Sequence, residues 1–185
     1  IVVATSLLVG AIFVVAGHNA TIVRAQEHPA LSEAHMQRIV ANCVSAKASL
    51  QQLRSNDVSL RVNRGQLYEY ISAKLMARFN GRAALNRLNN AQMVTSAAEF
   101  ERLLANFRVA YQHYATAVTD VLETDCRKNP QDFYYRVIEA RDKRSEVHQL
   151  VLRLAQGVNE YHGMFIVLMD DYTRALNGLG GEANG

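Results

Sequence analysis

Two cysteines are the residues of this chain with the clearest chemistry. Cys43 and Cys126 are an even number of thiols placed far apart, and no C-x-x-C motif is present. This spacing excludes zinc-ribbon and thioredoxin-type sites. In an exported protein the pair is a candidate disulfide, whereas in a cytosolic protein both would be small buried hydrophobic residues.

The usual signatures of metal sites and catalysis are missing from the sequence. No H-x-x-x-H or E-x-x-H pair occurs, so a metal centre held by helix faces is not predicted. There is no Ser-His-Asp order, Gly-rich phosphate loop or paired-carboxylate motif. The sequence therefore predicts no enzyme, no metal site and no cofactor. The histidines checked for ligand spacing are His18, His28, His35, His113, His148 and His162.

Three residues are candidates for contact with a ligand or a partner. Arg144 falls on an apolar helix stripe, which indicates a partly buried guanidinium paired with a carboxylate. An anion clamp inside the bundle is the alternative, but one arginine alone makes no clamp. Tyr70 and Tyr134 are expected to form an exposed patch near one end that could serve a partner, with ordinary packing as the simpler interpretation.

The segment that follows residue 57 is strongly basic and could be read as a phosphate-binding stripe. It lacks the interleaved aromatic residues typical of single-strand binding, and the acidic end of the next helix could neutralise part of it. The net charge is only +3. Nucleic acid is therefore not predicted as a partner. The basic residues are Arg54, Arg61, Arg64, Lys74, Arg78, Arg82 and Arg87.

An apolar stripe near the C-terminal end indicates the helix that must position these residues. Its steps alternate between four and three residues, and Arg144 is its only charged member. Such a heptad-like seam predicts one helix of about 60 Å that needs partner helices. The apolar members of the stripe are Phe133, Val137, Ala140, Val147, Val151, Leu154, Val158, Tyr161, Phe165, Leu168 and Tyr172.

Apolar residues at helical spacing predict four helices in all. Polar residues at 55–57 predict a break between the first two, although the sequence leaves open whether these are one bent helix or two. Only two prolines occur, which favours helix throughout. The predicted helices are residues 32–54, 58–90, 97–125 and 130–177.

Local signals predict where two of these helices begin. Ser96 and Glu99 match a capping box for the third helix. Asn129 is a preferred N-cap residue, and Pro130 is favoured at the first helical position, so the last helix should begin there.

The predicted fold is an all-α, antiparallel up-down bundle of about four helices at 32–177, with the last helix longest. The lower half of the last helix should lie beside the linker, project toward a membrane, or meet another chain. In this arrangement Cys43 lies roughly 18 Å below the end of the bundle that carries Cys126. A disulfide needs Cα atoms within about 7 Å. Either the first helix ends earlier, the topology differs, or the thiols are free.

The ends of the chain lie outside this bundle. Residues 1–23 carry no charge and are mostly apolar, which predicts a membrane anchor, with a cleaved signal segment or a buried helix as alternatives. Residues 24–31 are polar, contain Pro29 and are predicted to be a linker. Residues 178–185 are Gly-rich and predicted to be a disordered tail.

Two runs of sequence resemble uncharacterised exported helical proteins of candidate-phylum bacteria of the Saccharibacteria type. The runs are Asp57 to Tyr68 with Leu75 to Asn80, and Asp125 to Pro130 with Phe133, Tyr134, Ala140 and Arg141. The resemblance covers most of the folded body and implies an extracytoplasmic location. It implies no activity and no functional residue.

The sequence thus predicts a single-pass, membrane-anchored extracytoplasmic bundle that acts through protein–protein interaction in the cell envelope. The predicted contacts are the membrane, through the N-terminal helix, and a protein partner or a second copy, through the long last helix. Secretion after signal cleavage is the alternative location. The alternative function is a ligand-binding, sensor-type four-helix bundle of a receptor, which would need a second spanning helix after residue 185.

Overall fold

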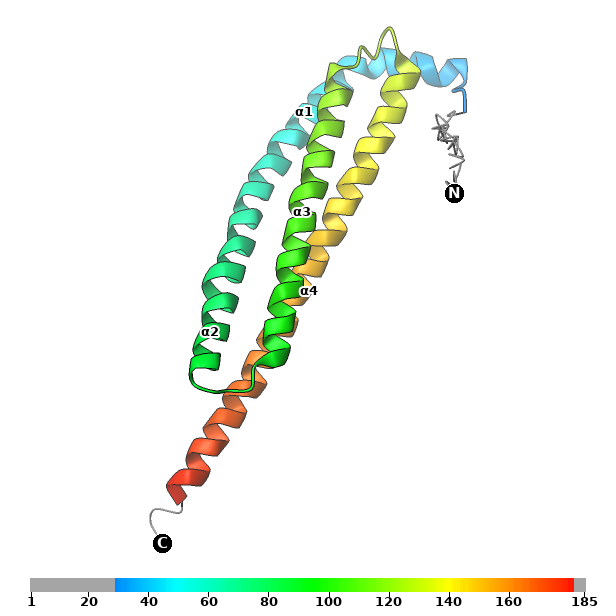
Figure 1. The fold of residues 1–185 in the computed structure, drawn as a ribbon. Coiled ribbons are helices and arrows are strands. Elements are labelled where there is room, and N and C mark those ends of the chain that lie inside the picture. The colour runs from blue at the N-terminus through cyan, green and yellow to red at the C-terminus, as the bar shows by residue number, and fades with distance from the viewer. Residues whose placement is uncertain (1–28, 182–185) are drawn as a thin grey trace, which may run out of the picture.

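The computed structural model describes residues 29–181, and this part of the chain is all-helical (Figure 1). Helix α1 is followed without interruption by a π-helical segment, η1, and by α2. These three elements form one long rod, and α3 and α4 complete an antiparallel arrangement of three rods. The elements are α1 (Glu33–Tyr70), η1 (Ile71–Met76), α2 (Ala77–Leu85), α3 (Ala91–Glu123) and α4 (Pro130–Gly181).

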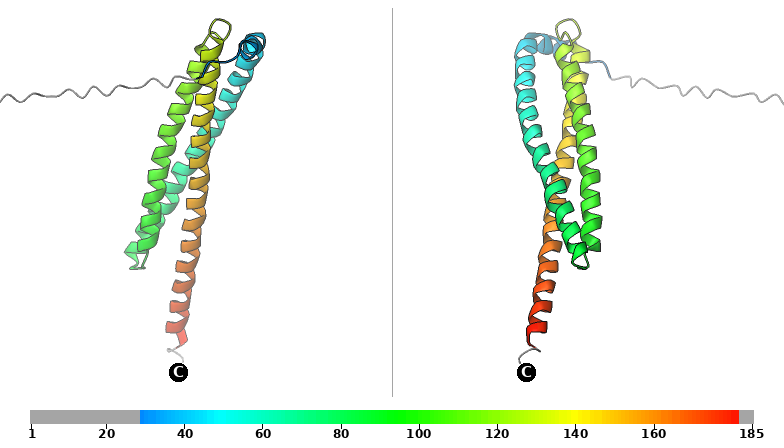
Figure 2. Two further views of the ribbon diagram at one scale, coloured as in Figure 1. Left: turned by 90° about the vertical axis from the view of Figure 1, so that its right-hand side faces the viewer. Right: turned by 60° about the vertical axis from the view of Figure 1, so that its left-hand side comes forward.

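The predicted break at residues 55–57 does not exist, so the bundle has three rods and not four. The polar side chains there find partners without interrupting the helix. Asn56 accepts a hydrogen bond from Gln52 on the preceding turn, and Asp57 accepts one from Tyr114 on α3. The first two predicted helices are therefore one bent helix. Its first turns lie across the end of the bundle, and the remainder descends beside α3 (Figures 1 and 2).

Helix α3 supplies the largest share of the hydrophobic core. It packs closely along α4, whereas α1 makes far fewer close contacts with either. Of the residues of α1, only Cys43 and Tyr68 are buried. The buried residues of α3 are Met93, Phe100, Leu103, Leu104, Phe107, Ala110, Tyr111, Tyr114, Ala117, Val118 and Val121.

Cys43 and Cys126 form a disulfide with a Cα–Cα distance of 5.7 Å. The sequence-based estimate of about 18 Å was wrong because it placed a turn near residue 55. The long rod instead turns only after Leu85, and α3 begins at Ala91. In this three-rod topology, Cys43 and Cys126 both lie at the end of the bundle opposite that turn. Of the three alternatives, a different topology is therefore the correct one.

The connection between α2 and α3 is held by a polar cluster that also contacts α4. Asn90, the N-cap residue of α3, donates to the backbone oxygen of Asn80 at 3.0 Å. Tyr161 of α4 donates to Asn80 Oδ1 at 2.9 Å. Arg87 has a φ of 59°, which turns the chain. The predicted capping box at Ser96 is wrong, because that residue lies inside α3.

Helix α4 begins at Pro130, as predicted, and with 52 residues it is the longest single α-helix in the described range. Asn129 accepts the first helical hydrogen bond, from the amide of Phe133 at 3.0 Å. The helix continues to Gly181, so residues 178–181 of the predicted tail are helical. Its end extends past the α2–α3 connection, away from the end where residue 29 enters (Figure 1).

The predicted anchor or signal segment at 1–23, most of the linker at 24–31 and the end of the predicted tail lie outside the described residues. Within residues 29–181, no helix combines the length and apolar character needed to cross a membrane.

We expect the disulfide to contribute strongly to stability because it closes a loop with a sequence separation of 83 residues. In the chain-entropy model, a cross-link over such a loop stabilises a fold by about 4 kcal/mol. The Cys43→Ala, Cys126→Ala double variant should therefore unfold at a clearly lower denaturant concentration, followed by circular dichroism. Equal midpoints for the variant and the wild-type protein would contradict this expectation.

Candidate functional site

The Asp57–Arg144 ion pair joins α1 to α4 in the half of the bundle nearer the disulfide. Nε of Arg144 donates to Asp57 Oδ2 at 2.9 Å, and Nη2 donates to Oδ1 at 3.1 Å. The Asp57 side chain is 11% exposed and the Arg144 side chain is 50% exposed. This bidentate geometry fixes the guanidinium plane, which a single contact would leave free to rotate.

Tyr114 of α3 reaches the same carboxylate and donates from its hydroxyl to Asp57 Oδ2 at 2.6 Å. Asp57 is therefore the one side chain that ties α1 to both other rods at this level. Burial opposes its ionisation, but the hydrogen bonds from Arg144 and Tyr114 outweigh burial and lower the pKa of the Asp57 carboxyl. Burial and the contact with Asp57 raise the pKa of Tyr114 far above its ordinary value.

A groove of about 280 Å³ opens beside this ion pair, and we call it the upper groove. Phe107, Tyr111 and Tyr114 of α3 contribute aromatic rings to its lining. The guanidinium of Arg61 lies over the Tyr111 ring, 4.7 Å from its centroid. The remaining lining residues are Asp57, Leu60, Arg64, Arg144, Val147, His148 and Val151.

The upper groove carries excess positive charge. Asp57 is the only carboxylate among the residues that line the groove, and it is paired with Arg144. Within residues 29–181, Arg61 and Arg64 have no ion pair. The arrangement is suited to an anion that carries an apolar body.

A second groove, the lower groove, lies between the π-helical segment and α4 and has a volume of about 490 Å³. Tyr161 lines it and donates to the backbone oxygen of Met76, the last residue of that segment, at 3.2 Å. Burial raises the pKa of the Tyr161 hydroxyl to about 12. The groove is lined by Ile71, Lys74, Leu75, Met76, Arg78, Phe79, Arg82, Val158, Tyr161, His162 and Phe165.

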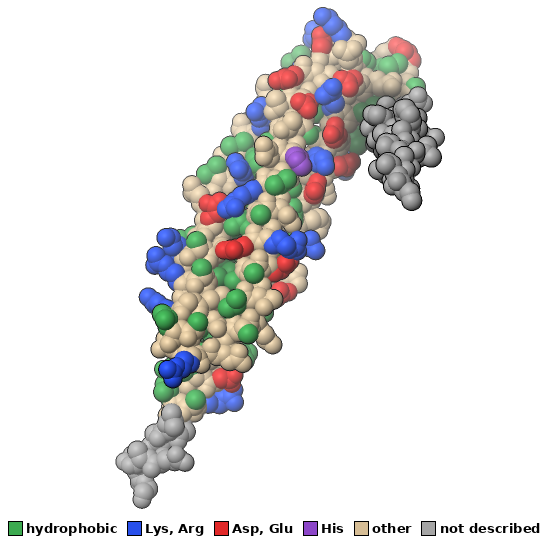
Figure 3. Space-filling view, in the orientation of Figure 1, with side chains coloured by type: hydrophobic (Ala, Val, Ile, Leu, Met, Phe, Trp, Pro, Cys, Tyr) green, Lys and Arg blue, Asp and Glu red, His purple; other side chains and the backbone are tan. Residues whose placement is uncertain are grey.

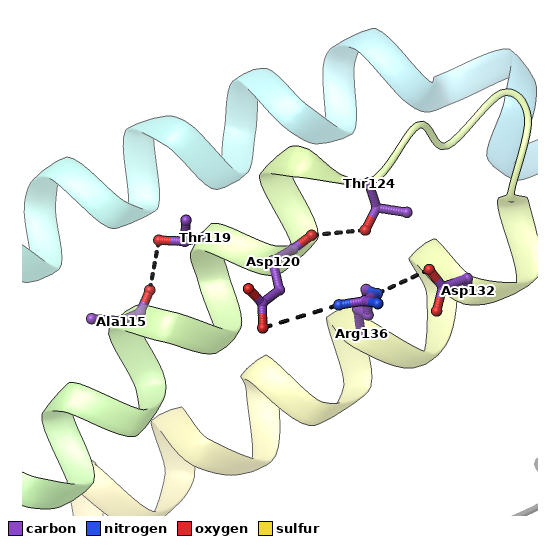
Figure 4. Close-up of polar contacts among 6 residues, drawn as sticks. All are labelled: Ala115, Thr119, Asp120, Thr124, Asp132 and Arg136. Carbon is purple, nitrogen blue, oxygen red and sulfur yellow. Dashed lines mark hydrogen bonds and ion pairs between the residues drawn. The ribbon is translucent and has the colours of Figure 1, made fainter.

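The acidic end of α3 does not neutralise the basic residues of the long rod, as the sequence suggested it could. Arg136 of α4 lies between Asp120 of α3, at 4.0 Å, and Asp132 of its own helix, at 2.9 Å (Figure 4). Asp125 accepts hydrogen bonds from the backbone amides of Arg127 and Lys128. These carboxylates therefore have partners near the disulfide. Lys and Arg side chains lie along the outer edge of the lower half of the long rod (Figure 3).

Tyr70 and Tyr134 do not form the single exposed patch that the sequence predicted. Tyr70 is the last residue of α1, beside the π-helical segment, and is 56% exposed. Tyr134 is in the first turns of α4 at the disulfide end, where its ring packs against Tyr135 with centroids 5.2 Å apart. The two tyrosines lie in opposite halves of the bundle because the predicted turn between the first two helices is absent.

Several groove residues escaped the sequence analysis. Asp57 was placed in a predicted break between two helices, and Tyr111 and Tyr114 were not singled out. One signal could have found Asp57: an arginine on an apolar seam requires a carboxylate from a neighbouring helix. The sequence offered no signal for the place of His148.

In the described part of the chain, no group of three or more His, Cys, Asp or Glu side chains could hold a metal ion. Comparisons of the chain with protein-family models, curated proteins and solved structures found no match.

We expect Asp57→Asn to destabilise the fold by about 2 kcal/mol at neutral pH, because an amide has no charge and only one acceptor oxygen for the donors of Arg144 and Tyr114. A carboxyl whose pKa is lowered by folding stabilises the fold above its unfolded pKa and loses that effect as the pH falls through its folded pKa. The gap between the wild-type protein and the variant should therefore close between about pH 5 and pH 2, measured by urea unfolding.

Asp142→Asn is the matched control, since that carboxylate is exposed on α4 and makes no hydrogen bond or ion pair within residues 29–181. It should change stability by no more than about 0.5 kcal/mol. A constant gap between the wild-type protein and Asp57→Asn across this pH range would contradict the assigned role of Asp57.

Proposed function

We propose that this chain is a membrane-anchored extracytoplasmic bundle that acts by protein–protein association in the cell envelope, with the end of α4 as its contact surface. The uncharged apolar segment at 1–23 supports the anchor. The buried Cys43–Cys126 disulfide supports a location outside the reducing cytosol.

The observation that carries the proposal is the apolar character of the end of α4. We call residues 166–181 the projecting end, since it reaches past the α2–α3 connection (Figures 1 and 2). Val167 is 61% exposed. A row of large apolar side chains without a covering helix is typical of an interaction surface. The exposed apolar residues are Ile166, Val167, Met169, Tyr172 and Leu176.

The proposed partner is a second copy of this chain. The lower groove is directly continuous with the projecting end, because Phe165 lines the groove and Ile166 follows it. The groove also carries Lys74, Arg78 and Arg82, while the projecting end carries Asp170 and Asp171, which share Arg174 as their cation and leave the end with a net negative charge. In a twofold pair, the end of each copy would lie against the groove of the other and bury both surfaces.

We expect full-length Val167→Cys to give a cross-linked dimer in membranes of expressing cells treated with a short bis-maleimide, because residue 167 would lie near the twofold axis. Val109→Cys is the matched control, since Val109 is an exposed valine in the middle of α3. It should give no dimer above background. Equal cross-linking of both variants, or of neither, would contradict association through the projecting end.

The charge arrangement can be tested on the same background. Arg78→Glu should reduce the Val167→Cys dimer several-fold, because it places like charges against Asp170 of the other copy. Adding Asp170→Arg should restore much of the dimer by reversing both partners. Loss without restoration would argue against this pairing of groove and helix end.

A second candidate function is ligand sensing by an extracytoplasmic bundle that belongs to a receptor. The upper groove is the observation that favours it, because excess positive charge and aromatic rings meet there.

A further inference from the structure

We propose that the upper groove is a binding site for a small organic anion, with a carboxylate or phosphate group attached to a flat apolar body. The inference rests on the second candidate function and is independent of association through the projecting end. Its basis is the juxtaposition of Arg61, Arg64 and Arg144 with the aromatic side of α3.

The charge of the groove selects an anion. Arg61 and Arg64 are one helical turn apart on α1 and have no carboxylate partner within residues 29–181. His148 of α4 also lines the groove and can donate a hydrogen bond. No acidic residue other than Asp57 lines the groove, so an incoming anion would meet two arginines that lack a counter-charge.

The Asp57 carboxylate does not oppose this assignment, because its charge is compensated. It accepts hydrogen bonds from Nε and Nη2 of Arg144 and from the Tyr114 hydroxyl. This pairing leaves Nη1 of Arg144 unused by Asp57 and holds the guanidinium in place. Asp57 thereby acts as a positioning residue for a third cationic donor at the groove.

The aromatic and aliphatic side chains set the shape of the ligand. Phe107, Tyr111 and Tyr114 come from α3, while Val147 and Val151 come from α4. The Arg61 guanidinium lies over the Tyr111 ring, and this contact restricts the position of the guanidinium. Its N–H groups can still donate hydrogen bonds to a ligand beside the ring. A volume of about 280 Å³ accommodates roughly one ring with its acidic group.

The test is isothermal titration of the full-length protein in detergent micelles with two probes, benzoate and phenyl phosphate. Phenol, which has the ring without the charge, and inorganic phosphate, which has the charge without the ring, are the ligand controls. We expect at least one probe to bind and both controls to bind at least tenfold more weakly. Binding of benzoate alone identifies a carboxylate ligand, and binding of phenyl phosphate alone identifies a phosphate ester.

The Arg61→Gln, Arg64→Gln double variant should lower the affinity for the bound probe at least tenfold. The matched control is Arg127→Gln, Arg141→Gln, which removes the same charge from exposed positions that line neither groove and should change affinity less than twofold. Arg64→Gln alone should weaken binding several-fold, and it should not affect folding because Arg64 makes no hydrogen bond or ion pair within residues 29–181.

Absence of binding by both probes would overturn the proposal, as would equal losses in the two double variants, which would indicate unspecific attraction to positive charge. The cross-linking of Val167→Cys provides a separate readout. It should be unchanged by Arg64→Gln, so the failure of either proposal can be told apart from the failure of the other.

Discussion

The fold depends on how α1 is attached to the closely packed pair of α3 and α4. Helix α1 fully buries only Cys43 and Tyr68, and Ile39, Ala46 and Leu50 are partly buried against the core, so apolar burial holds α1 less firmly than it holds α3. Its position is fixed by separate ties: the disulfide at one end, the Asp57 pair in the middle, and the Tyr68 ring between Phe100 and Phe107 below. Continuity with α2, whose connection to α3 is locked by Asn80 and Asn90, fixes the far end. Because α1 is attached to α3 and α4 at separate points, grooves can form between those points.

Both grooves are consequences of this spaced attachment. The upper groove lies beside the Asp57–Arg144 pair, and the lower groove lies where the π-helical segment faces α4. Both are basic because no carboxylate of α3 lines either groove. Asp120 pairs with Arg136, and Glu99 pairs with Arg102. Between the points where α1 is attached, arginine and lysine side chains lie beside exposed apolar side chains. The spaced attachment that limits stability therefore also creates surfaces that can bind a ligand or a partner.

The sequence predicted the parts of this fold that local signals control. The all-helical class, the start of α4 at Pro130 and the apolar seam of α4 follow from periodicity and capping. The break at residues 55–57 was wrong because the same polar residues that form turns can also be exposed on a helix or paired across a bundle. The partners of Asp57 are 57 and 87 residues away, so no local pattern could choose between these roles. The upper groove was missed for that reason: Arg144 was expected to pair with a carboxylate, but Asp57 was placed in a break between two helices.

The positions of the two ends give the proposed function a direction. Residue 29 enters at the disulfide end, where the Tyr135 hydroxyl donates to the backbone oxygen of Pro29. Helix α4 runs from that end for about 78 Å, at 1.5 Å per residue. If residues 1–23 are an anchor, the projecting end therefore lies far from the membrane that holds the chain. Of the three expectations for the lower half of α4, proximity to the linker and projection toward the membrane do not fit this geometry. Contact with another chain does, because large apolar side chains of the projecting end are exposed and not covered by the rest of the described chain.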